Sequence, residues 1–286
     1  MQFSDTPRQS VVAGRFYSDT PQSLREEVLR YLRMRPQKLV DLKGRELLAL
    51  LVPHAGYVFS GPIAGMTLGQ ASLPDRLIVL GPNHTGHGAP LSVWNGGPWR
   101  TPLGAMPVDE AASSALVAAN VGFSGDTKAH VQEHSLEVLV PFFQIMNPNA
   151  RMAAVTVSRM PLAALQKAGE ALAAVVADAA ASGDTILIVV SSDMSHYLPH
   201  DKSVLMDTLA LDALKTLDPE TYFKTIQDNG ISMCGVFPMT LALFALAKLG
   251  AAKARVMAYA TSGQTGRAHG ADMERVVGYA GVAITR

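Results

Sequence analysis

Short apolar runs alternate along the chain with segments whose apolar residues recur at helical spacing. The runs have the length of buried strands, and helices are expected between them. The clearest predicted strands are residues 47–52, 76–80, 151–157 and 185–190. Strands separated by helices favour right-handed βαβ crossovers and a parallel sheet. We therefore predict a single α/β domain over residues 1–286, built as three α/β/α layers around a largely parallel sheet.

Local signals predict where the other elements begin and end. Thr20 and Pro21 are typical of a helix N-cap and first turn, and Pro36 would end that helix. A helix is also expected to begin near Glu133, and Asn95-Gly96 is typical of a hairpin turn within residues 89–108. Further helices are predicted at 62–73, 109–119, 161–181, 201–217, 219–229 and 237–249. Closing strands at 255–260 and 276–284 would make the sheet mixed at its edges.

Three predicted strands run directly into polar loops that carry histidine. His54 lies in VPHAGYVFSG, His84 in GPNHTG, and His196 lies with Asp193 in SSDMSHY. Because the carboxyl ends of parallel strands face the crevice where open α/β sheets hold ligands, these side chains are expected to meet there. Each histidine alone is equally typical of a polar residue satisfied at a strand end. The threefold recurrence of the pattern favours a functional site.

Cys234 is the only cysteine, and it precedes the helix predicted at 237–249. A thiol at a helix N-terminus has a lowered pKa, although a lone cysteine is usually a small buried hydrophobe. Imidazoles with a thiolate or a carboxylate would suit a first-row metal ion. Glu133 and His134 would either face this site or merely begin a helix, where an acid favours the dipole. SSDMSHY also holds the residue types of a Ser-His-Asp triad, but the chain lacks a G-x-S-x-G elbow.

Charge and composition exclude several classes of function. Lys and Arg number 24 and Asp and Glu number 24, so no net positive charge is available to hold a nucleic acid. A single cysteine forms no disulfide within the chain and fits a reducing compartment. The N-terminus has no apolar core of a signal peptide, and no apolar run approaches the roughly 20 residues that cross a bilayer. We expect a cytoplasmic protein without nucleic-acid or membrane partners.

Five motifs, in this order, resemble those of the Memo family: VPHAGYVFSGPIAG, GPNHTG, EHSLEVLVPF, SSDMSHY and MCG. The resemblance extends over nearly the whole chain, from GRFY near the N-terminus to the closing strands. The family is similar in fold to class III extradiol dioxygenases, which are non-haem iron enzymes. The resemblance implies a metal pocket formed by His54, His84 and Cys234. Asp193 and His196 would lie beside it, with His196 in the place of the acid/base histidine of the dioxygenases.

The resemblance also indicates which metal cofactor and which partners to expect. Where the dioxygenases use a carboxylate ligand, this sequence offers Cys234, and its softer thiolate tolerates Fe(II), Zn or Cu. One function class is a redox enzyme that acts on a small molecule, in which His196 moves a proton and Asp193 orients a ligand or His196. The other is a non-catalytic module that binds peptides, including phosphotyrosine peptides. A radical SAM protein partner is implied by microbial relatives.

Overall fold

A mixed sheet with a parallel centre organises the computed structural model, which describes residues 1–36, 42 and 45–286. The strand order is β10-β11-β1-β8-β2-β7-β3-β6, and β9 pairs with β11. The strands are β1 (Leu47–Val52), β2 (Arg76–Pro82), β3 (Leu91–Val93), β6 (Ser124–Gly125), β7 (Arg151–Val157), β8 (Ile186–Ser191), β9 (His196–Leu198), β10 (Lys253–Thr261) and β11 (Val276–Thr285). β1, β8, β2 and β7 run parallel and the closing strand β11 joins them antiparallel, as the sequence predicts, whereas β3 adds a further antiparallel strand that the sequence does not predict.

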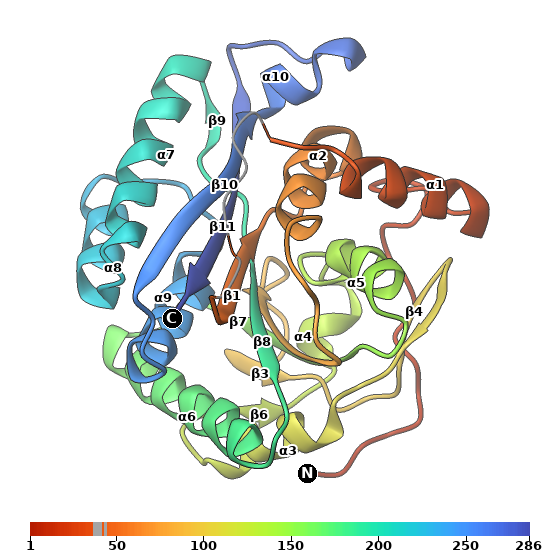
Figure 1. Ribbon diagram of the computed structural model, residues 1–286, viewed down its shortest axis with the longest axis vertical. Coiled ribbons are helices and arrows are strands. Elements are labelled where there is room, and N and C mark those ends of the chain that lie inside the picture. Colours follow the sequence, from red (N-terminus) through yellow and green to blue (C-terminus); the bar gives the residue numbers. More distant parts are fainter. Residues whose placement is uncertain (37–41, 43–44) are drawn as a thin grey trace.

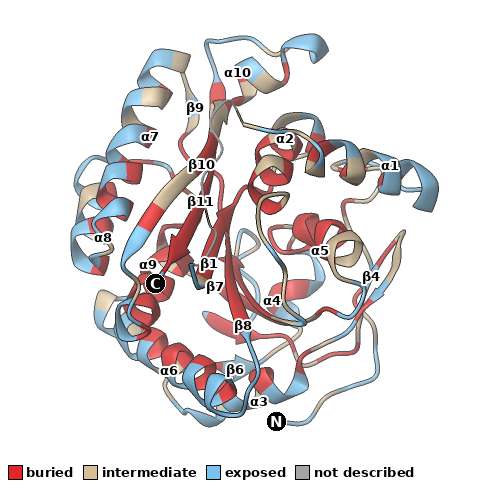
Figure 2. Ribbon diagram, viewed as in Figure 1, coloured by how far each residue is buried: buried red, intermediate tan, exposed pale blue. Residues whose placement is uncertain are grey.

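Helices cover both faces of this sheet (Figure 1). They are α1 (Pro21–Leu32), α2 (Tyr57–Leu68), α3 (Glu110–Ala118), α4 (Lys128–Val131), α5 (Val140–Met146), α6 (Leu162–Ala181), α7 (His200–Lys215), α8 (Pro219–Asp228), α9 (Val236–Lys248) and α10 (Ser262–Thr265), with 3₁₀ turns η1 (Glu137–Leu139) and η2 (Arg267–His269). Leu77 and Val79 of β2 pack with α1, α2 and α5, whereas Ile78 and Leu80 pack with α6, α8 and α9. Figure 2 shows the buried residues gathered along the strands and on the inward helix faces. The predicted three layers are confirmed.

Three local predictions are wrong in their details. The helix predicted at 62–73 spans Tyr57–Leu68 and holds Pro62 inside it, where Gly61 and Gly65 on either side pack closely against Tyr31 of α1. Glu133 begins no helix, since its carboxylate accepts the amide of Ser135 and the chain turns there before η1. Asn95-Gly96 is not the hairpin turn, which lies between β4 (Trp99–Thr101) and β5 (Gly104–Met106).

The Glu137 carboxylate fixes the N-terminal segment to the chain that precedes α5. The Arg8 guanidinium donates to it at 2.7 Å, the amides of Val11 and Val12 at 2.9 and 3.0 Å, and the Tyr17 hydroxyl at 2.7 Å. Glu137 is fully buried and Arg8 is 2% exposed. Burial, reinforced by the Glu137 charge, raises the pKa of Tyr17, which therefore keeps its proton. Residues 8–17 are thus tied to the turn at 133–137.

Replacing Arg8 by methionine should reduce the free energy of unfolding by about 3–5 kcal/mol, because it leaves the buried Glu137 carboxylate without its counter-charge. Arg286→Met is the matched control, since the Arg286–Glu46 pair is exposed and its loss should cost below about 1 kcal/mol. Urea unfolding of both variants measures the difference. Equal losses of unfolding free energy in the two variants would show that the buried Arg8–Glu137 pair stabilises the fold no more than the exposed pair does.

Candidate metal centre

His54 lies two residues beyond the end of β1, and its imidazole is held in one tautomer. Its Nδ1 is 2.7 Å from the Ser191 hydroxyl at the end of β8. That hydroxyl already donates its proton to the carbonyl of Ser135, at 2.6 Å. The His54 Nδ1–H must therefore be the donor, and Nε2 keeps its lone pair. Burial, followed by the neighbouring His84, holds the pKa of His54 well below its usual range, so the ring is neutral.

Cys234 presents its sulfur to this lone pair. The distance from Sγ to Nε2 of His54 is 3.4 Å, and the amide of Asp193 donates to Sγ at 3.2 Å. Although Cys234 retains some exposure, burial and the nearby Asp193 raise the pKa of its thiol. The lowered pKa expected from the following helix is therefore wrong, because desolvation outweighs the helix dipole.

His84, just beyond the end of β2, is held by Glu133. Its Nδ1 donates to Oε1 of Glu133 at 2.9 Å, and its main-chain amide donates to Oε2. Burial opposes ionisation of Glu133, but hydrogen bonds from His84 and Ser135 outweigh it and lower the pKa to about 2. The carboxylate is thus ionised, and it leaves Nε2 of His84 as the free ring nitrogen.

His134 completes a group of three imidazoles. Its ring stacks on His84 with centroids 4.8 Å apart and meets His54 edge-on at 5.7 Å. Its Nδ1 lies 3.5 Å from Oε1 of Glu133. The side chains of His84 and His134 are 34% and 27% exposed, so solvent reaches the group from their side. The sequence left the roles of Glu133 and His134 open, and the structure brings both to the site.

His54, His84 and Cys234 each offer a donor atom, and these atoms lie within 4.8 Å of one another. A tetrahedral first-row ion with typical bond lengths separates a nitrogen from a sulfur ligand by about 3.5 Å. The separation of 3.4 Å between His54 and Cys234 matches that value. His84, Glu133 and His134 form a second such group, but His84 and Glu133 are hydrogen-bonded to each other. The second group therefore supports the first, whose donors fit a metal ion.

Asp193 and His196 stand beside this group in different ways. Oδ1 of Asp193 accepts the main-chain amide of His54 at 2.8 Å, and burial raises the Asp193 pKa to about 6. His196 is half-buried, and its Nδ1 donates to the carbonyl of Ser232 at 2.8 Å. Among the described residues, the hydrogen bond of the Asp193 carboxylate in this region is to the main chain of His54. Asp193 therefore fixes the backbone that carries the imidazole.

The chain is similar to known proteins over nearly its full length. A family model described as Memo-like protein matches residues 8–283. The chain belongs to the Memo family. A MEMO1 family protein of Sulfolobus acidocaldarius is 36% identical, with 96% of this chain and 98% of that protein covered. A MEMO1 family protein of Methanopyrus kandleri is 33% identical, with 98% and 99% covered.

The Memo fold also resembles a solved structure. The crystal structure of an uncharacterized protein from Escherichia coli K12 superposes with a TM-score of 0.57, covers 83% of this chain and 99% of its own, and is 15% identical. At that identity the likeness concerns the fold alone. Within the described part of this Memo protein, no helix has both the length and the apolar character to cross a membrane.

In the metal-free protein at neutral pH, the His54 ring should be protonated at Nδ1 and unprotonated at Nε2, because its pKa is held well below the usual range and Nδ1 donates to Ser191. Nitrogen NMR of the imidazoles distinguishes the two tautomers. Ser191→Ala should remove the tautomer preference of His54, because Nδ1 loses its acceptor, whereas Ser92→Ala, a buried serine in β3, should leave it intact. A His54 ring protonated at Nε2 in the unaltered protein would contradict the geometry.

Proposed function

We propose that this Memo protein binds one transition-metal ion, Fe(II), through Nε2 of His54, Nε2 of His84 and Sγ of Cys234. The observation that carries this proposal is the pairing of a thiol with two imidazoles whose Nδ1 atoms are hydrogen-bonded. In each imidazole Nδ1 is used in a hydrogen bond, so the nitrogen left free is the one available to an ion. Metal binding would release the thiol proton, since a coordinating sulfur is a thiolate.

The donor set favours a redox role over a purely structural one. Structural zinc sites are closed by four protein ligands, whereas two imidazoles and one thiolate leave positions open. The partly exposed side of the crevice at His84 and His134 would admit a small molecule to them. The chemistry supplied by a bound Fe(II) would be activation of O2 toward an organic substrate. Zn and Cu(I) are the alternative ions that a thiolate accepts.

His196 is the proton carrier in this proposal. Its Nδ1 donates to the carbonyl of Ser232, so the neutral ring keeps Nε2 free to accept a substrate proton. The half-buried position of the ring also leaves it in reach of solvent. Asp193 acts on the other side of the site, where it holds the main chain of His54 in place. Ring cleavage of a catechol by O2 is the reaction class to test, because both oxygen atoms enter the product and no added reductant is needed.

Anaerobic reconstitution with Fe(II) should load about one ion per chain, the ratio expected for a single mononuclear site. His54→Ala or Cys234→Ser should lose most of this metal, since each removes a ligand atom. His87→Ala is the control, because His87 lies exposed in the same loop as His84 and outside the ligand group. Elemental analysis of the dialysed proteins measures the ratio. Equal metal content in all variants, or none in the unaltered protein, would overturn the proposal.

His196→Gln should keep the iron but slow O2 consumption with catechol by about 10²–10⁴-fold, the usual contribution of a general acid/base. An oxygen electrode measures the rate and elemental analysis measures the iron. His200→Gln is the matched control, since His200 contacts Thr261 and is not part of the metal group, which consists of His54, His84 and Cys234. Unchanged turnover in His196→Gln would remove this residue from the mechanism. Iron binding without O2 consumption in the unaltered protein would instead favour a non-catalytic peptide-binding module.

A further inference from the structure

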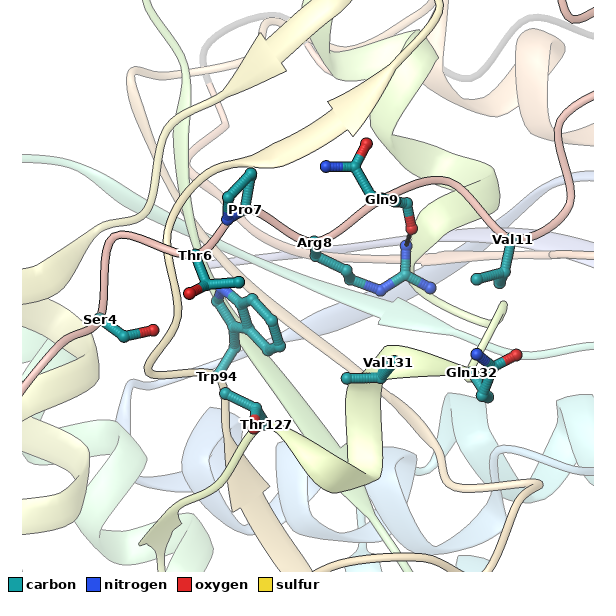
Figure 3. A pocket seen from close by; sticks show the side chains of 10 residues that line it. All are labelled: Ser4, Thr6, Pro7, Arg8, Gln9, Val11, Trp94, Thr127, Val131 and Gln132. Carbon is teal, nitrogen blue, oxygen red and sulfur yellow. Dashed lines mark hydrogen bonds between the residues drawn. The ribbon is translucent and has the colours of Figure 1, made fainter.

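A slot separate from the metal group lies between the N-terminal segment and α4 (Figure 3). Its volume is about 370 Å³. Thr6, Gln9 and Val11 contribute to one wall, Val131 and Gln132 to the other, and the indole of Trp94 lies between the walls at one end. The described residues that line it include none of the candidate site residues His54, His84, Cys234, Asp193 and His196.

The walls combine apolar surface with uncharged polar groups. Val11, Val131 and the Trp94 ring are apolar; Val131 is 44% exposed despite its hydrophobic side chain, whereas Trp94 is only 2% exposed. The side-chain amides of Gln9 and Gln132 provide both hydrogen-bond donors and acceptors. Apolar walls with a few polar groups are the usual composition of small-molecule sites.

Arg8 is the charged residue among the described lining residues, and its charge is already compensated. Its guanidinium donates to the Glu137 carboxylate at 2.7 Å, to the carbonyl of His130 at 2.8 Å and to the carbonyl of Glu133. It also stacks on the Trp99 ring, 4.2 Å from the centroid. An anionic ligand would therefore find no free positive charge, and a cationic ligand would find no carboxylate in the walls.

The wall formed by the N-terminal segment is fixed by main-chain hydrogen bonds. The amide of Gly97 donates to the carbonyl of Thr6 at 2.8 Å, the amide of Arg8 donates to Pro98 at 3.0 Å, and the amide of Arg100 donates to the carbonyl of Arg8 at 2.7 Å. A preformed wall lowers the entropy cost of binding. The slot is thus present before a ligand enters.

We propose that this slot is a second ligand site, which takes a small uncharged molecule with a planar apolar body and an amide group. The flat body would lie between Val11 and Val131, with the 2% exposed Trp94 closing one end, and the amide would pair with Gln9 or Gln132. The volume lies in the lower part of the usual range for ligand pockets, so it fits a compact molecule. This site does not require the metal ion, so its test is independent of the proposed function.

Benzamide is the probe, because it joins a planar ring to a neutral amide. Nitrogen–proton NMR of the full chain follows the indole N–H of Trp94 and the side-chain amides of Gln9 and Gln132. These signals should shift saturably, with a Kd on the order of 1 mM for so small a molecule. No saturable shift, or shifts centred on His84 and His134 instead, would overturn the proposal.

Two variants at exposed positions test the location. Val131→Arg and Gln132→Trp should each weaken binding by at least roughly tenfold, because a larger side chain fills the slot. Leu205→Arg is the matched control, since Leu205 is 57% exposed on α7 and is not among the lining residues. Unchanged affinity in both slot variants would exclude this site. Benzoate or benzamidine binding as tightly as benzamide would overturn the assignment to an uncharged ligand.

Discussion

The buried Glu137 carboxylate is the constraint on which the candidate site depends. Burying this charge is costly unless its oxygens are fully used, and four donors from residues 8–17 use them. The same contacts hold the turn at 133–137, which carries Glu133, His134 and the carbonyl of Ser135. The Arg8 guanidinium also donates a hydrogen bond to the main-chain carbonyl of Glu133. The N-terminal segment therefore positions Glu133 and Ser135, which hold His84 and the His54–Ser191 pair.

Hydrogen bonds fix both imidazoles of the candidate metal centre. Ser191 and Glu133 each engage one Nδ1, so each imidazole keeps Nε2 for coordination. The parallel centre of the sheet explains the meeting place, because β1, β8 and β2 end side by side and their loops emerge at one edge. Cys234 lies just before α9 rather than after a strand, and its Sγ is in contact with Nε2 of His54.

Arg8 links two regions with different chemistry. Its hydrogen bonds to Glu133 and Glu137 hold the turn next to the metal group. Arg8 also lines the slot, where its charge is already compensated and the wall is neutral. Family membership extends over nearly the full chain, while the likeness to the Escherichia coli structure concerns the fold. The roles proposed for His54, His84, Cys234, Asp193 and His196 in binding or catalysis rest only on their geometry in this chain.

The sequence by itself determined the alternating elements, the parallel centre of the sheet and the strand ends that carry His54 and His84. These features follow from local periodicity and from turn residues, which act over a few neighbours. Only the tertiary structure decided that Glu133 holds His84, that Asp193 holds the amide of His54, and that desolvation raises the thiol pKa of Cys234. The reason is separation along the chain. Glu133 and Asp193 act on residues 49 and 139 positions away, where no local pattern records the contact.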